Sequence, residues 1–443
     1  MKTLTPMKRP LALAVLLACA TPVAADNLVD VYRQAQSRDP IWAAAHANYS
    51  ANLERQTQGH ALLLPTVTLS ASTSQSDQKV KTPMIDDTFR YRTDTYTLQL
   101  TQPIYRKQNF AGYAQGEAAA AQAEADLASA RQDLILRTTQ AYLSVLSSQD
   151  VLEFARAEKS SIEKLLSLSK RNFSVGNAKL VDVHEAQAAY DLAVAQEIAA
   201  TNDFEVKREA LRVLTGNAPG SFARLGQMLE LAGPEPADME KWSAASVDNP
   251  QVKSQEQVVE TARREIEKNI GTTYPTLDFA AGHTYNDAGG SVQGIPIYTN
   301  TNQIGLVFQM PLYQGGGGSS RVREASARRD AAEQQLESVR RQAAQQTREQ
   351  YLAVINGVAR VKALEQAQAS NQRALESSLL GYERGLRTNI DVINAQRGLY
   401  RTRRDLSQAR YDYLFARLRL KSAVGQLSDA DLEDVNRLLA SSP

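Results

Sequence analysis

The alternation of hydrophobic and polar positions changes period along the first half of the chain. Between residues 27 and 64, apolar residues recur at helical spacing in segments separated by Asp39-Pro40, and Pro65 ends the second segment. From Thr66 the period falls to two, and polar residues without charge alternate with apolar ones. This pattern predicts strands at 66–76 and 91–102, each with one apolar and one polar face, joined by a polar loop.

The second half repeats this order. A helical pattern follows Asn249-Pro250 and ends near Tyr274-Pro275, after which the period-two alternation returns. It predicts strands at 276–286 and 302–310. Each strand pair ends in a similar corner, Gln-Pro-Ile-Tyr at 102–105 and Gln-Met-Pro-Leu-Tyr at 309–313.

Long segments without proline follow both corners. Residues 110–173 and 319–382 consist largely of Ala, Gln, Glu, Arg and Leu, and about 63 residues of helix span roughly 95 Å. Return helices are predicted at 180–214 and 389–424. A helix of this length extends beyond a globular domain and needs a partner along its length, so we expect long helical hairpins over 106–214 and 319–424.

The last return helix carries a heptad pattern. Large residues recur every seven positions at Leu399, Leu406, Tyr413 and Leu420, and the offset positions between them are small: Ala395, Thr402, Ala409, Ala416 and Ala423. Small residues at one core position of a heptad allow close, nearly parallel packing. The pattern together with the helix length favours a coiled coil over the core of an ordinary bundle.

The turns between the long helices match each other. Three positions of the first hairpin recur in the second at a common offset of about 209 residues. Tyr382 corresponds to Phe173, Gly385 to Gly176 and Asp391 to Asp182. Glycine can take the positive φ that ends a helix, and Thr388 or Asn389 can cap the next one. The sequence therefore predicts a tandem duplication with two hairpin tips that turn at Gly176 and Gly385.

This organisation predicts five segments: a signal peptide at 1–25, a first repeat at 26–214, an aperiodic inter-repeat segment at 215–248, a second repeat at 249–424 and a tail at 425–443. The signal peptide has a basic head and a short apolar core before small residues. Cys19 lies in Leu-Leu-Ala-Cys, which resembles a lipoprotein cleavage box except for the bulky Leu17. We expect the inter-repeat segment and the tail to lie against the outside of the long helices.

The charge balance argues against a nucleic-acid partner. The whole chain has 50 Lys and Arg against 49 Asp and Glu, whereas nucleic-acid binders carry basic excess. After the predicted signal peptide there is no run of about eighteen apolar residues, the length that a helix needs to cross a membrane. Any crossing must therefore be made by strands.

The predicted strands cannot close a barrel within one chain. Four strands at about 4.8 Å spacing make a sheet about 19 Å wide, and its free edges are costly in lipid. Two chains would give eight strands and a filled interior, whereas three would give twelve and an open lumen. The polar faces rich in Thr, Ser and Gln favour the wet lumen.

Two further stretches stand out beside the duplicated plan, both corners and both tips: Ala-Arg-Tyr-Asp-Tyr-Leu at 409–414 and Lys-Ser-Ala-Val-Gly at 421–425. In all of these features the chain resembles the TolC family of bacterial outer-membrane channels. The resemblance covers nearly the whole mature chain. It implies a mainly α homotrimer whose shared twelve-stranded β-barrel lies in outer-membrane lipid and continues as a long α-helical coiled-coil barrel across the periplasm. It also implies docking on an inner-membrane pump through a periplasmic adaptor, for drug efflux or type I secretion.

The resemblance further implies a gate at the periplasmic tips. Its aspartate matches Asp182, its tyrosine Tyr382 and its arginine Arg387, and a ring of lumen-facing aspartates matches Asp391. A second aspartate ring of the family is occupied here by Asn394. Weaker capture of cations at the constriction is therefore expected.

Other functions have less support in the sequence. The four histidines have no ligand spacing and no nucleophile stands at a recognisable distance from a base, so we expect no metal site, cofactor or catalytic residue. A trimeric surface stalk, similar to an adhesin and anchored by a shared barrel, is the alternative; it uses one barrel segment at one chain end, whereas two strand pairs are predicted here. The sequence does not separate drugs from proteins as cargo.

Overall fold

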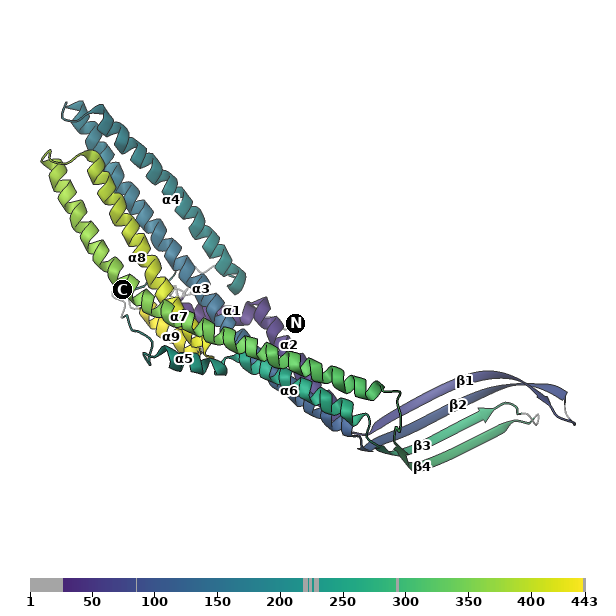
Figure 1. The fold of residues 1–443 in the computed structure, drawn as a ribbon. Coiled ribbons are helices and arrows are strands. Elements are labelled where there is room, and N and C mark those ends of the chain that lie inside the picture. Colours follow the sequence, from purple (N-terminus) through teal and green to yellow (C-terminus); the bar gives the residue numbers. More distant parts are fainter. Residues whose placement is uncertain are drawn as a thin grey trace, which may run out of the picture.

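The computed structural model of the chain is elongated. It describes residues 27–84, 86–217, 222, 225–226, 231–291 and 295–440. The predicted signal peptide and Cys19 lie outside the described residues. A sheet forms one end of the molecule, the turns of two helical hairpins form the other, and the short helices gather around the middle (Figure 1).

The sheet joins the two repeats. It contains β1 (Thr66–Lys81), β2 (Asp86–Tyr105), β3 (Thr276–Ala288) and β4 (Ile297–Gln309), in the order β1-β2-β3-β4. All neighbouring pairs are antiparallel, and β2 of the first repeat pairs with β3 of the second. The outer edges of β1 and β4 have no neighbour among the described strands.

The register separates the two faces that the sequence predicts. Leu98 pairs with His283, which pairs with Asn302, so Leu306 and Phe308 lie on the face of Leu98 because side chains alternate along a strand. The polar positions occupy the other face, where Thr97 pairs with Thr284 and Gln99 with Gly282. Around these positions one face of the sheet is mainly apolar, with His283 and Asn302 among the leucines, and the other is mainly polar and uncharged, with Asp278 near its helical end as a charged exception paired to Arg106.

The strands extend beyond their predicted ends. The segment 77–90, expected as a loop, is largely strand, because β1 reaches Lys81 and β2 begins at Asp86. Charged cross-strand partners replace the apolar alternation there, including Arg90 with Asp77 at 2.8 Å. β4 also begins earlier than predicted, at Ile297.

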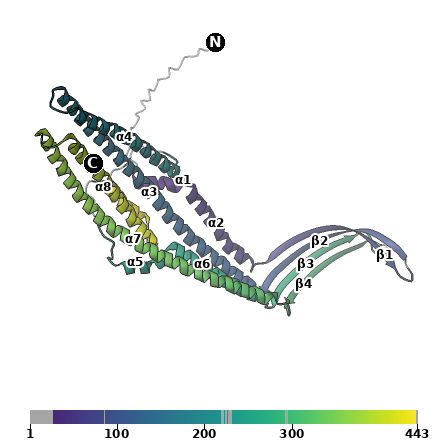
Figure 2. The ribbon, with the colours of Figure 1, turned by 45° about the horizontal axis from the view of Figure 1, so that its top comes forward.

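Helices account for the rest of the length. α1 (Leu28–Arg38) and α2 (Pro40–Ala61) precede the first strand, and α6 (Pro250–Gly271) precedes the third. α3 (Lys107–Ser174) and α7 (Gly317–Glu383) contain 68 and 67 residues, and they return through α4 (Leu180–Thr215) and α8 (Asn389–Ala423). We call α3–α4 the first hairpin and α7–α8 the second; Figure 2 shows them side by side along one direction of the molecule.

The heptad positions of α8 are buried. The four large heptad residues are each less than 5% exposed: Leu399 2%, Leu406 4%, Tyr413 1% and Leu420 3%. The small residues Ala409 and Ala416 between them are buried as well, and so is Ala423 after the last of them. The seam predicted from the sequence is thus the packing face of this helix.

The middle of the molecule contains helices that the sequence pattern did not reveal. They are α5 (Met239–Ala245), the 3-10 helix η1 (Ser246–Asp248) and α9 (Asp429–Ala440). Leu432, Val435 and Leu439 of α9 join the main apolar core. The Tyr413 hydroxyl donates to the Ala232 carbonyl at 2.8 Å, so the inter-repeat segment packs against α8.

Within the described part of the chain, the apolar stretches of the helices are too short or too interrupted by charge for any helix to span a membrane.

Candidate functional site: the paired hairpin tips

The two hairpins turn in the same way at the end far from the sheet. α3 ends at Ser174 and α7 at Glu383, and the glycines that follow, Gly176 and Gly385, have φ of 80° and 71°. These are left-handed conformations that glycine adopts without steric cost. We call residues 175–179 the first tip and residues 384–388 the second tip.

Each returning helix begins with an aspartate that caps its own first turn. The Asp182 carboxylate accepts a hydrogen bond from the Lys179 N–H at 3.0 Å. The Asp391 carboxylate accepts from the Thr388 N–H at 2.9 Å and from the Thr388 hydroxyl at 2.7 Å. The hydrogen bonds from the Thr388 backbone and side chain hold the pKa of Asp391 below its ordinary value of 3.8.

The structure brings the three predicted gate residues to one cavity between the tips. This cavity of about 550 Å³ is lined by Asp182 of the first hairpin and by Tyr382 and Arg387 of the second, together with the residues of both turns. The stem of Arg387 covers Gly381, where an added Cβ would lie 2.6 Å from the Arg387 Cγ. Asp391, in contrast, is not among the residues that line the cavity.

Within this chain, the described side chains of Tyr382 and Arg387 make no hydrogen bond to the Asp182 carboxylate. The two hairpins are instead linked by Asn389, whose Nδ2 donates to the Asp182 carbonyl oxygen at 2.8 Å. Asn389 is 1% exposed. The sequence indicates only a helix start at this position, because a bond between the tips depends on how the two hairpins pack.

An apolar cluster lies directly behind the cavity. Ile162 and Leu165 of α3, Ala189 and Ala193 of α4, and Val392 and Ile393 of α8 form its buried part. Tyr382 packs against this cluster with part of its surface exposed. The tips thus combine a polar, water-accessible cavity with an apolar support.

The described residues contain no group of three or more His, Cys, Asp or Glu side chains that could hold a metal ion.

The two repeats both match one family of known proteins. The model of the outer membrane efflux protein family aligns with residues 31–217 and again with residues 242–426. The chain belongs to the outer membrane efflux protein family. It is thus an outer-membrane channel protein built from a tandem duplication.

Relatives in this family cover nearly all of the chain. Outer membrane protein TolC of Vibrio cholerae is 33% identical, and the alignment covers 98% of each chain. The alkaline protease secretion protein AprF of Pseudomonas aeruginosa is 31% identical over 95% of this chain and 89% of that protein. Efflux-family relatives thus include a protein named for secretion of a protease.

A solved structure has the same fold. The outer membrane protein VceC of Vibrio cholerae superposes with a TM-score of 0.78, covering 90% of this chain and 96% of that chain at 21% identity. The fold of this chain is therefore shared over nine tenths of its length.

Proposed function

We propose that this chain is the exit duct of a tripartite efflux or type I secretion system. The duct passes drugs or proteins from an inner-membrane pump, through a periplasmic adaptor, to the outside. The observation that carries the proposal is a sheet with one apolar face joined end to end with helical hairpins too long for a globular domain. Its function is transport, and no step in it requires catalysis.

The duct is a homotrimer. The strand edges of β1 and β4 would be unpaired in lipid, where each unsatisfied backbone group costs several kcal/mol. Pairing β4 of one chain with β1 of the next satisfies both edges, and three chains give twelve strands. The polar face then lines the lumen, the apolar face contacts outer-membrane lipid, and the helical hairpins continue the tube across the periplasm.

The tips form the periplasmic gate. Arg387 reaches Asp182 of a neighbouring protomer, and Tyr382 donates to the same carboxylate. Exposed pairs are worth only about 0–1 kcal/mol each, so three symmetry copies hold the tube shut weakly. An adaptor opens the tips if it binds the open form more tightly than the closed form by more than the free energy of these pairs. Asp391 contributes a ring of charge at the constriction.

A surface stalk is not favoured as an alternative. A stalk needs one barrel segment at one end of the chain, whereas the sheet here is assembled from strands of both repeats. β2 leads into α3 and β4 leads into α7, so each half of the sheet is followed by a helical hairpin. That arrangement continues a tube rather than a solid stem.

Deletion of the chain in its own host tests the duct. We expect accumulation of a fluorescent efflux dye in the cells, loss of a secreted protein from the medium, or both, with restoration by a plasmid copy. The two readouts separate drugs from proteins as cargo. Unchanged dye accumulation together with an unchanged set of secreted proteins would contradict the proposal.

A further inference from the structure

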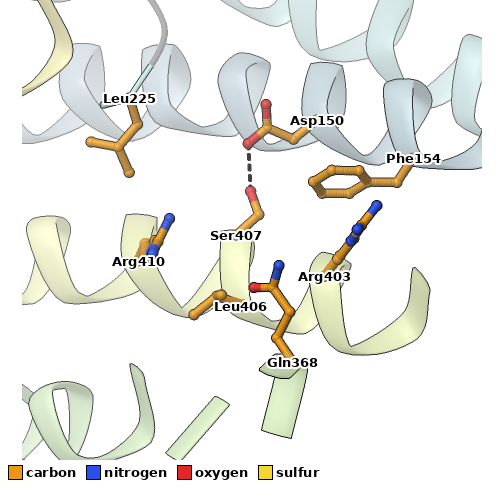
Figure 3. Close-up of a pocket in the computed structure, with 8 residues that line it drawn as sticks. All are labelled: Asp150, Phe154, Leu225, Gln368, Arg403, Leu406, Ser407 and Arg410. Carbon is orange, nitrogen blue, oxygen red and sulfur yellow. Dashed lines mark hydrogen bonds between the residues drawn. The ribbon is translucent and has the colours of Figure 1, made fainter. Parts of the chain in front are cut away.

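The two hairpins of the chain meet along the interface of α3 and α8, and hydrogen bonds between side chains cross its middle. The Asp150 carboxylate accepts from the Ser407 hydroxyl at 2.5 Å, and Figure 3 shows this bond at the edge of a cavity beside α8. Further bonds join Ser147 to Gln408, Tyr411 to Asp150, Arg404 to Glu158 and Ser161 to Tyr400. We call this set the polar seam.

The polar seam fixes one antiparallel register. Ser147 of α3 contacts Gln408 of α8, and further along α3 Ser161 contacts Tyr400, which comes earlier in α8. The two helices therefore run in opposite directions. A slide by one helical turn, about 5.4 Å, would carry the partners of Ser147, Glu158 and Ser161 away from them. Hydrogen bonds are directional, so the seam resists sliding in a way that an apolar contact does not.

Buried charge strengthens this resistance. Glu158 is 2% exposed, and its Oε2 lies 2.9 Å from the Arg404 Nη1. Removing one partner of a buried ion pair leaves an uncompensated charge, which is strongly unfavourable. Burial and the neighbouring Asp150 carboxylate also raise the pKa of Tyr411 above its ordinary value of 10.0, so its phenol remains a donor.

The same interface changes character between Ser161 and the tips. Its core there is the apolar cluster around Ile162, Leu165 and Val392. Among the described residues on this side of Ser161, the two hairpins are joined by the hydrogen bond from Asn389 to the Asp182 carbonyl. Apolar packing is less directional than hydrogen bonding, so it tolerates small displacements. The part near the tips is therefore less constrained in register than the part at the polar seam.

We propose that the Glu158–Arg404 ion pair, with the Ser161–Tyr400 contact beside it, is the pivot of the tip gate. α8 stays in register with α3 on the sheet side of this pair, and the helices separate on the tip side. Glu158 and Arg404 are positioning residues: they touch no cargo, and they set the length of the segment that swings. This inference rests on the gate proposed above.

Thiol cross-linking locates the pivot. Cys19 is the single cysteine and lies in the predicted signal peptide, so introduced pairs can be linked selectively. Ser147→Cys with Gln408→Cys ties the seam on the sheet side, and Leu165→Cys with Ile393→Cys ties the apolar part. Both pairs are placed in the Arg387→Ala background, linked with a short bis-maleimide, and compared in planar bilayers.

We expect Arg387→Ala to raise the single-channel conductance severalfold, because it removes a contact of the proposed gate. The Leu165–Ile393 link should abolish that rise, while the Ser147–Gln408 link should leave it intact. Equal loss of the rise with both links would overturn the pivot and leave the gate standing. If Arg387→Ala causes no rise, the gate assignment fails instead, and the pivot is then decided by hydrogen exchange of the unmodified trimer in detergent.

The rate of amide hydrogen exchange should drop abruptly along α8 at Tyr400, from the tip side to the sheet side. We expect amides of 389–399 to exchange at least about tenfold faster than those of 404–415. Glu158→Gln should move this change in rate toward the sheet. The charge-swapped double variant, Glu158→Arg with Arg404→Glu, should return it to Tyr400. The control is Arg156→Gln, which removes an ion pair to Glu197 within the first hairpin and should leave the change in rate at Tyr400. Uniform exchange across α8 in the wild type would refute the pivot.

Discussion

At the scale of single residues, the tips depend on carboxylates that cap helices. Asp391 accepts two hydrogen bonds from Thr388, and Asp182 occupies the equivalent position of the first hairpin. The same aspartates were expected from the sequence to serve the gate and the lumen. Capping fixes where each carboxylate lies, and the proposed gate would use the carboxylates in these positions.

The cap at Asp391 predicts how the second tip responds to pH. Because its pKa in the folded chain lies below 3.8, the carboxylate stabilises the tip above that value, and this contribution is lost as the pH falls through the lowered pKa. Exchange of the amides at 388–392, corrected for its intrinsic pH dependence, should therefore increase only at pH values below 3.8.

Asp391→Ala provides the control, because it removes the oxygen that accepts the Thr388 hydrogen bonds and should exchange rapidly at every pH. Loss of wild-type protection already well above pH 3.8 would show that another group governs the cap.

At the scale of elements, the strand register predicts which positions contact lipid. Leu98→Arg places a charge on the apolar face and should cost about 2–4 kcal/mol near the middle of the bilayer. Gln99→Arg, one residue away on the polar face, should be tolerated. The measurement is the yield of assembled protein in outer-membrane fractions. Equal yields of the two variants, or a lower yield of Gln99→Arg, would contradict this assignment of the faces.

Sequence periodicity was sufficient for the long elements of this fold. α3 and α7 could be predicted because their segments lack proline and are rich in residues that favour helices, and the strand faces followed from period-two alternation. The ends of β1 and β2 were missed because charged pairs such as Arg90 with Asp77 replace the apolar positions there.

Other features depend on tertiary packing and had no signal of their own. α5 and α9 contain 7 and 12 residues, too few for a periodic pattern to stand out. The Asn389 bond to the Asp182 carbonyl joins residues 207 positions apart. The gate residues were proposed through a family resemblance, and their shared cavity came into view only when the two hairpins were placed together.

At the scale of the whole molecule, the open edges of the sheet predict assembly. Chemical cross-linking of intact membranes should give a trimer, and detergent should be needed to extract it. The reason is that β1 and β4 have free edges among the described strands, which lipid does not satisfy. Cross-linking that stops at the monomer, or recovery of the protein in the soluble periplasm, would contradict this assembly.

The central claim is a channel closed at its periplasmic end by Asp182, Tyr382 and Arg387, and single-channel conductance tests it most directly. In planar bilayers, Arg387→Ala or Asp182→Ala should raise the conductance severalfold, because each removes contacts that hold the tips together. Arg384→Ala, charged and close but outside the proposed gate, should conduct as the wild type does. Wild-type conductance in both gate variants would contradict the claim.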